Sequence, residues 1–269
     1  MPAYNAAATL EATCHAIDAR SIEEIILVDD CSQDETVAVA EKLALRVIRH
    51  SKNLGYGGNQ KTCYREALQR GADIVVMLHP DGQYDPTLLP KLIQPLAEGR
   101  ADIVLGSRFL IPGGARRGGM PLYRFLANRF LTFWENLVLR QRLSEYHTGY
   151  RAYSRAFLEA VPFRQNSDGF CFDTEILVQA AAFRQRLVEI PITTKYFPGA
   201  SSASPMQCVI YGLMTLFTLI KFLLHHWRLY AAPLFVGPHE HKAEPQPQKS
   251  KASFQRMKNG QLIKTILAK

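Results

Sequence analysis

Asp73-Ile74-Val75-Val76-Met77-Leu78 is a continuous apolar run rich in β-branched residues, and His79-Pro80-Asp81-Gly82-Gln83 follows it directly. A run of this length, bounded by Pro and Gly, is typical of a strand that is buried on both faces of a sheet. We therefore predict a strand over 73–78 whose carboxyl end delivers a polar turn over 79–83.

Comparable runs occur along the rest of the chain. They lie at 24–28, 45–48, 101–105 and 188–192, and stretches with helical patterning lie at 36–45, 58–69 and 87–98. This alternation of strand and helix predicts an α/β fold with a mostly parallel sheet that is covered by helices on both faces. Ligands of such sheets bind outside the carboxyl ends of the strands, which is where Asp29, Asp30, Asp81 and Gln83 lie.

The charge balance separates a nearly neutral body from a basic tail. The 269 residues carry 32 Lys and Arg against 24 Asp and Glu, a net charge of +8, and 47% are hydrophobic. This composition excludes a fully disordered chain, a collagen-like repeat and a polytopic membrane protein. Residues 238–269 alone hold seven Lys and Arg against two Asp and Glu. Because the body has no basic stripe, we expect no nucleic-acid partner. We interpret the tail as a disordered, solubilising end, with contact to an anionic membrane as the alternative.

The five cysteines are scattered and form no Cys-x-x-Cys pair. An odd number of scattered cysteines in a chain of this size argues against a disulfide framework and against a thiolate zinc site. The first residues also lack the charged start and apolar run of a signal peptide. We therefore expect a cytoplasmic protein with reduced thiols.

The segment 209–224 is strongly apolar and is interrupted only by Lys221 and small polar residues. It falls short of the roughly 20 apolar residues that a secure transmembrane helix needs. Trp227 and Tyr230 follow it and add amphipathic rings. We interpret 209–230 as a peripheral contact with the cytoplasmic face of a membrane. A helix packed on the domain or on a second subunit is the alternative.

The turns after 24–28 and 73–78 carry carboxylate and amide oxygens. These hard ligands suit Mg²⁺ or Mn²⁺ better than zinc, and such an ion typically bridges a diphosphate and neutralises a phosphate leaving group. Taken separately, each turn is better explained as a surface turn rich in Asp and Gly.

Six motifs taken together are far more specific than either turn. They are Pro2-Ala3-Tyr4-Asn5, the segments 28–36 and 53–59, the segment 79–86, Gly106-Ser107-Arg108-Phe109 and the segment 147–153. This set, in this order, resembles family 2 glycosyltransferases with the GT-A (Rossmann-like) fold. The likeness is to the branch of dolichyl-phosphate mannosyltransferase-like and polyprenyl-phosphate glycosyltransferase-like enzymes, and it runs from Pro2 to about Gly199.

The resemblance implies a donor-binding role for the first motifs. Pro2, Ala3 and Tyr4 are similar to the strip that packs against the nucleoside. Asp29, with Asp30 beside it, resembles the aspartate that contacts the base or ribose.

The remaining motifs imply the loop, the metal and the phosphate contacts. Asn53 and Gly55 are similar to the residues that shape the loop after the next strand. Asp81 and Gln83 resemble the last two members of the Asp-x-Asp-x-Gln metal motif, which implies bound Mg²⁺ or Mn²⁺. Arg108 is similar to the arginine near the donor or acceptor phosphate.

The chain departs from the family pattern in two places. His79 replaces the first aspartate of the metal motif, and imidazole is a poorer partner for a hard ion. In addition, the family's first strand precedes the Pro-Ala-Tyr-Asn motif, whereas only Met1 precedes Pro2 here. The resemblance therefore implies a truncated first strand and an exposed slot in the centre of the sheet.

The implied reaction is transfer of a sugar from a UDP- or GDP-linked donor with inversion at the anomeric carbon. A lipid phosphate acceptor, such as a polyprenyl phosphate, needs no strong base, whereas a hydroxyl acceptor needs a carboxylate to take its proton. Asp173 and Glu175 are the main candidates, with Glu145 a third, and capping of a helix N-terminus is the alternative role for the first two.

For His147, Arg116 and Arg117 too, a functional and a purely structural role are both open. His147 either orients the acceptor or is a satisfied polar residue under its loop. Arg116 and Arg117 lie in a Gly-rich segment, 111–119, which we interpret as a mobile basic loop. They either clamp phosphate or are simply solvated.

We expect three regions: a GT-A domain over 1–200, an apolar helical region over 201–237 and the basic tail over 238–269. Two other functions stay open. One is a nucleotidyltransferase, which also uses an acidic metal site on such a sheet. The other is a degenerate nucleotide-sugar-binding protein without turnover, which His79 and the truncated strand would explain.

Overall fold

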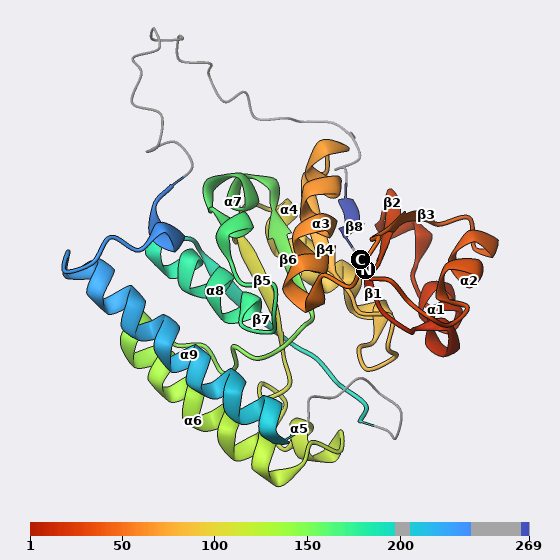
Figure 1. Ribbon diagram of the computed structural model, residues 1–269. Coiled ribbons are helices and arrows are strands. Elements are labelled where there is room, and N and C mark those ends of the chain that lie inside the picture. Colours follow the sequence, from red (N-terminus) through yellow and green to blue (C-terminus); the bar gives the residue numbers. More distant parts are fainter. Residues whose placement is uncertain (197–204, 238–264, 269) are drawn as a thin grey trace, which may run out of the picture.

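The computed structural model of the chain describes residues 1–196, 205–237 and, for the backbone, 265–268 (Figure 1). Within these residues one sheet of eight strands forms the centre of the molecule. The strands are β1 (Pro2–Ala3), β2 (Glu24–Asp29), β3 (Arg46–Arg49), β4 (Ile74–Met77), β5 (Ile103–Ser107), β6 (Arg151–Ser154), β7 (Leu187–Pro191) and β8 (Thr265–Ala268). β6 runs antiparallel to β4 and β5, whereas the other pairings between these strands are parallel. The predicted α/β fold with a mostly parallel sheet is confirmed.

Helices cover both faces of this sheet. They are α1 (Ala7–His15), α2 (Thr36–Lys42), α3 (Gly55–Gln69), α4 (Leu89–Ala97), α5 (Gly114–Arg117), α6 (Leu122–Leu139), α7 (Arg155–Ala160), α8 (Phe172–Ala182) and α9 (Pro205–His226). β4 shows why two layers of helices are needed. Val75 and Met77 belong to one buried cluster with residues of α3 and α8, while Ile74 and Val76 belong to a second with residues of α4. Because successive side chains on a strand point to opposite faces, an all-apolar strand must be covered twice.

The middle of the sheet differs from the expectation. β8 lies between β2 and β4 and pairs in parallel with both. The exposed slot expected in the centre of the sheet is therefore filled, by residues far along the chain. The interpretation of 238–269 as a disordered tail is corrected at 265–268, which form this strand. Residues 238–264 and 269 lie outside the described residues.

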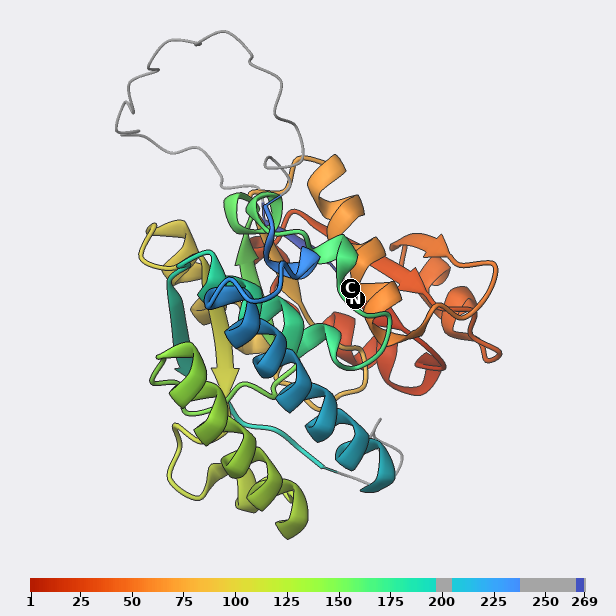
Figure 2. The same cartoon turned by 60° about the vertical axis from the view of Figure 1, so that its left-hand side comes forward.

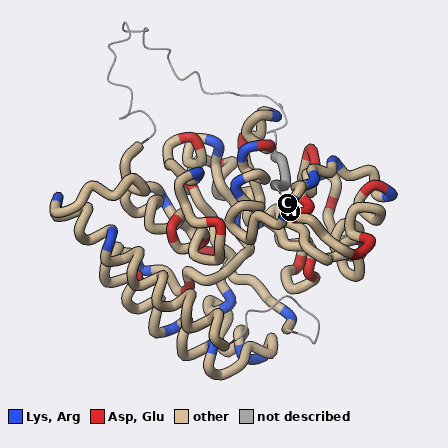
Figure 3. Tube along the Cα trace, viewed as in Figure 1, with Lys and Arg blue, Asp and Glu red and all other residues tan. Residues whose placement is uncertain are grey.

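α6 and α9 pack against each other beside the sheet domain (Figures 1 and 2). Both helices expose large apolar side chains, among them Leu122, Leu126, Phe130, Phe133 and Leu137 on α6 and Val209, Ile210, Leu213, Phe217 and Ile220 on α9. We call this set the α6–α9 apolar face. The few charges on the two helices are mostly basic (Figure 3).

The predicted apolar helix is confirmed and begins earlier in the chain, at Pro205. Its length of 22 residues and a mean hydropathy of 1.8 would allow it to cross a membrane, and only 17% of the apolar window is buried inside the protein. α9 is therefore not a core helix of the sheet domain. The exposed apolar side chains of α9 are therefore free to contact a membrane or another protein.

Candidate active site

A cleft of about 780 Å³ opens at the carboxyl ends of β2, β4 and β5. Most of the residues predicted from sequence line it, namely Pro2, Ala3, Tyr4, Asp30, Asn53, Gly55, Asp81, Gln83, Arg108 and Asp173. Asp29 and Glu175 are absent from the lining. The sheet thus gathers motifs that are up to about 170 residues apart in sequence, because parallel strands end on the same edge.

Asp29 and Asp30 have different surroundings although they are adjacent. The Asp29 carboxylate accepts from the backbone N–H of Ser32 and shapes the turn after β2. The Asp30 carboxylate accepts from the N–H groups of Leu54 and Gly55 at 2.8 and 3.0 Å, and it contacts the His50 ring at 2.7 Å. Asp30 therefore lies in the cleft wall and holds the 53–55 loop in place.

The N-terminus of α3 is closed by protein rather than left open for an anion. The N–H groups of Gly57 and Gly58 donate to the carbonyl oxygen of Asp168. A Cβ on Gly57 would lie 2.3 Å from the carbonyl oxygen of Ser167, so only glycine permits this approach. Lys61 pairs with the Asp168 carboxylate at 2.8 Å and secures the loop.

The turn after β4 presents the metal motif to the cleft. His79 stacks on Tyr56, with ring centroids 5.5 Å apart and planes within 8°. Burial lowers the pKa of the His79 imidazole, which favours the neutral ring. Asp81 accepts from the N–H of Gln83 at 3.0 Å, which fixes the turn. In the described part of the chain, no three His, Cys, Asp or Glu side chains are grouped closely enough to hold a metal ion by themselves.

Asp173 is anchored on three sides. Tyr56 donates its hydroxyl to Asp173 at 2.8 Å, Gln60 donates at 3.0 Å, and the buried guanidinium of Arg151 lies 3.3 Å away. Asp173 is in the first turn of α8, yet these contacts lead away from its own helix. The capping alternative is therefore not what its side chain does here.

Glu175, two residues on, turns away from the cleft. Its carboxylate accepts from the N–H of Ser167 at 2.6 Å, and burial raises its pKa above the usual value. Because Ser167 belongs to the loop that closes α3, Glu175 supports that loop. The structure separates the two acids that the sequence placed together.

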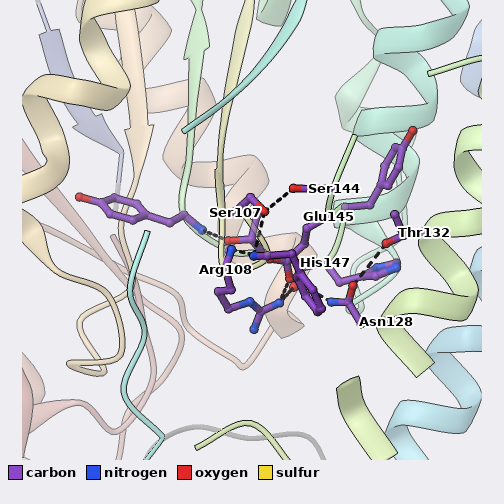
Figure 4. A network of polar contacts seen from close by, with 12 residues as sticks. Ser107, Arg108, Asn128, Thr132, Ser144, Glu145 and His147 are labelled. Atoms are coloured by element: carbon purple, nitrogen blue, oxygen red, sulfur yellow. Dashed lines mark hydrogen bonds and ion pairs between the residues drawn. The ribbon is translucent and has the colours of Figure 1, made fainter. Parts of the chain in front are cut away.

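Arg108 is the centre of a buried polar network (Figure 4). Its side chain pairs with Glu145 and also donates to the carbonyl oxygen of His147 at 2.7 Å. Glu145 further accepts from Asn128 at 2.9 Å and from the Arg108 N–H at 2.9 Å. Burial alone would lower the pKa of Arg108, but the Glu145 carboxylate outweighs it, and the net shift is upward. Glu145 is thus a partner of Arg108 and lies outside the cleft lining.

Sequence reasoning missed the group that holds His147. The His147 ring lies 3.0 Å from the fully buried Glu135 of α6 and 2.8 Å from the hydroxyl of Tyr211 of α9. Tyr211 in turn bonds Thr174 of α8 at 2.9 Å. Three helices therefore meet at one wall of the cleft. Glu135, the one acid in the helical stretch 122–139, was the available signal.

The basic segment 111–119 contains a short helix, α5, where the sequence predicted a loop. Arg116 donates to the carbonyl oxygen of Met120, and Arg117 donates to that of Pro112 at 2.7 Å. Neither lines the main cleft, although Arg117 lines a smaller cavity beside Tyr196. Arg124 of α6, which the sequence reasoning did not select, does line the cleft.

Comparison with known proteins adds sequence relatives. Residues 1–161 match the family model described as glycosyl transferase family 2. The undecaprenyl-phosphate mannosyltransferase of Micrococcus luteus is 31% identical over 200 residues, which is 72% of this chain and 81% of the relative. The polyprenol monophosphomannose synthase of Mycolicibacterium smegmatis is 31% identical over 63% of this chain and 65% of its own length.

Solved structures agree in fold. Glucosyl-3-phosphoglycerate synthase from Mycobacterium tuberculosis, crystallised with phosphoglyceric acid, superposes with a TM-score of 0.62 at 19% identity. The match covers 82% of this chain and 77% of that one. At this identity the likeness speaks for the fold alone.

Proposed function

The chain belongs to glycosyl transferase family 2, and on that premise we propose that it transfers a sugar from a nucleoside diphosphate sugar to a polyprenyl phosphate at a membrane surface, with inversion at the anomeric carbon. The names of two relatives, undecaprenyl-phosphate mannosyltransferase and polyprenol monophosphomannose synthase, support this acceptor class. Both UDP and GDP donors fit the proposal.

The contacts of the acidic side chains in the cleft favour a phosphate acceptor over a hydroxyl acceptor. In the described part of the chain, the acidic side chains that line the cleft are Asp30, Asp81 and Asp173. Asp30 is engaged by two backbone N–H groups and a histidine, and Asp173 by Arg151, Tyr56 and Gln60. Asp81 accepts from the backbone N–H of Gln83 and belongs to the metal motif. A hydroxyl acceptor would need a further base, whereas a phosphate acceptor is already ionised and nucleophilic.

The donor would lie along the β1–β2–β4 side of the cleft. Pro2, Ala3 and the half-exposed Tyr4 provide a surface for the nucleoside. Asp30 presents the rigid wall beside them, and Arg108 would face the phosphate groups, held by Glu145 so that its charge is fixed in direction.

The oxygen ligands in the cleft suit a divalent ion that binds together with the nucleotide sugar. Asp81 offers one carboxylate and Gln83 one amide oxygen, both on the cleft, and these are hard ligands. Such a pair is too few for a protein-only site, so the two side chains would hold an ion only together with the bound nucleotide sugar. We propose Mg²⁺ or Mn²⁺ here, and its chemistry would be to neutralise the charge on the departing diphosphate.

The acceptor would enter from the α6–α9 side. Arg124, Asn128 and Leu131 of α6 and Gln207, Cys208 and Tyr211 of α9 line that end of the cleft. The α6–α9 apolar face lies on the same two helices and would rest on the cytoplasmic surface of a membrane. The membrane contact expected through 209–230 would then include α6 as well. We accordingly divide the chain into a catalytic domain over 1–200 and a membrane-contacting region over 201–237.

Transfer to a phosphate can be separated from transfer to an alcohol. Purified protein with Mn²⁺ is incubated with labelled UDP-glucose or GDP-mannose and vesicles containing undecaprenyl phosphate, and matched vesicles contain undecaprenol. We expect labelled lipid in the phosphate vesicles alone. Transfer to the alcohol alone would reject the acceptor assignment. Donor binding without any product would favour the degenerate binding protein that His79 suggested.

A further inference from the structure

The sheet is completed by a strand from the far end of the chain. Thr265–Ala268 pairs with Ile74–Met77 of β4, and residues 266–268 pair with 24–26 of β2. A parallel strand with a neighbour on each side is a central strand, and its backbone groups serve both ladders. Remote residues thus form the join between the two halves of the sheet.

β8 and β1 lie on the same edge of β2. Ile26 pairs with Ala268 and with Arg46 of β3, while Val28 pairs with Pro2 and with Ile48 of β3. Because a strand has only two edges and β3 takes one, both β8 and β1 use the other. The Met1 amine donates to the Ile26 carbonyl oxygen at 3.1 Å, so β1 starts where β8 ends (Figure 1).

The position of β8 matters for the cleft. Asp30 directly follows β2, and His79 and Asp81 lie in the turn after β4. These residues form the two sides of the proposed donor site. Neighbouring strands lie about 4.8 Å apart, so one intervening strand sets β2 and β4 roughly 10 Å apart. Without β8, both strands would present unpaired backbone groups to the gap, and nothing would keep that spacing.

We propose that residues 265–268 are a working part of the donor site: the carboxyl-terminal strand binds between β2 and β4 of its own chain, and the donor binds well only while this slot is filled. The donor part of this statement rests on the proposed function. The connecting segment 238–264 can span up to about 90 Å. A domain of this size has an expected radius of gyration of about 18 Å, so the strand reaches its slot within one chain.

Hydrogen exchange on the full chain tests the strand directly. We expect the backbone amides of 265–268 to be protected, together with those of β2 and β4. Exchange of 265–268 at the rate of an unstructured peptide would overturn the proposal. Size measurement by light scattering belongs to the same experiment. A monomer with protected 265–268 amides supports insertion within one chain, whereas protection that is present in a dimer and lost on its dilution to monomer would mean that a second copy supplies the strand and would overturn that part.

Ile266→Pro tests the dependence of the donor site, with Ile266→Val as the matched control. Proline removes a ladder N–H and is excluded from central strands, whereas valine suits a strand. We expect Ile266→Pro to deprotect β2 and β4 amides, to lower Tm by roughly 5 °C or more and to weaken binding of UDP-glucose or GDP-mannose with Mn²⁺. Unchanged exchange and binding would refute the proposal.

A rescue experiment distinguishes loss of the strand between β2 and β4 from general misfolding of the Ile266→Pro chain. A second copy of residues 257–268 is placed directly before Met1 in the Ile266→Pro chain, because Ala268 pairs with Ile26 and Pro2 pairs with Val28, which leaves room for Met1 alone between them. We expect Tm, exchange protection and donor binding to return. Failure of the rescue would reject the slot as the cause. If Ile266→Val shows a filled slot yet binds neither donor, the proposed function fails while the strand assignment stands.

Discussion

At the scale of the residue, Asp29 and Asp30 show how little sequence distance says about surroundings. Both are buried at the end of β2, but only Asp30 lines the cleft, because neighbouring side chains of a strand point to opposite sides. The resemblance placed the donor contact on Asp29. The structure brings Asp30 to that surface and leaves Asp29 to hold the turn through Ser32.

Asp81 is the residue on which the metal proposal depends. Asp81→Asn removes the one carboxylate of the metal motif, so we expect kcat to fall about 10²-fold or more. The Tm should stay close to that of the wild type. Asp18→Asn, at an exposed surface pair with Arg20, serves as the control. Mn²⁺ binding in the presence of UDP should also disappear, and retained turnover and Mn²⁺ binding would remove Asp81 from the site.

Asp173 and Glu175 are expected to separate in function. Asp173→Asn leaves the buried Arg151 without its carboxylate partner, and we expect roughly 3 kcal/mol of lost stability by urea unfolding, with weaker transfer. Glu175→Gln keeps an oxygen for the Ser167 N–H and lies outside the cleft, so transfer should continue. Loss of transfer in Glu175→Gln alone would reverse this assignment.

Glu175 also gives a pH test with a definite sign. Burial raises its pKa above 4.5, so the folded state binds the proton more tightly than the unfolded state. Its contribution to stability is therefore present at low pH and is lost as pH rises through the folded pKa. Glu175→Gln should gain stability relative to the wild type as pH rises above the usual glutamate pKa of 4.5 in urea titrations. A gap that grows toward low pH would contradict this reading.

At the scale of the element, the α6–α9 apolar face is the feature that local patterning underestimated. The apolar run at 209–224 is visible in the sequence, but its pairing with α6 places the exposed apolar side chains of a second helix beside it. Exposed apolar patches of this extent mark interaction sites, and the basic residues on the two helices suit anionic lipid.

Charge placed on the α6–α9 apolar face should detach the protein from vesicles. Leu126 and Leu213 are 58% and 64% exposed, so glutamate at both positions costs little fold stability. We expect partitioning into vesicles with anionic lipid to fall at least about tenfold in sedimentation assays. Leu110→Glu, at an exposed position off this face, is the control. Equal losses in control and double variant would argue against a specific docking face.

At the scale of the whole molecule, the donor site is a property of the assembled sheet. Its parts come from β1, β2, β4, β5 and α8, and β8 joins the two halves. A donor that binds only this assembly stabilises it by about 2.7 kcal/mol at a hundred times Kd. We therefore expect one of UDP-glucose and GDP-mannose, with Mn²⁺, to raise Tm by roughly 5–10 °C. A shift of equal size without metal would contradict joint binding of metal and donor.

Local pattern was enough for the α/β class, the buried strand at 73–78 and the position of Asp30, Asp81 and Gln83 at strand ends, whereas Pro2, Ala3, Tyr4, Asn53, Gly55 and Arg108 were predicted from the family resemblance. The former follow from the chain itself because hydrophobic period and turn chemistry are short-range signals, and because parallel strands bring their carboxyl ends to one edge.

Only the tertiary structure decided the remaining features. The antiparallel β6, the engagement of Asp173 by Arg151 and the pair of His147 with Glu135 each join segments that no local pattern connects. The same holds for β8, whose short run near the end of the chain is read as a tail by composition and charge. Its place in the sheet is set by backbone pairing with β2 and β4, a long-range interaction that a linear reading of sequence does not contain.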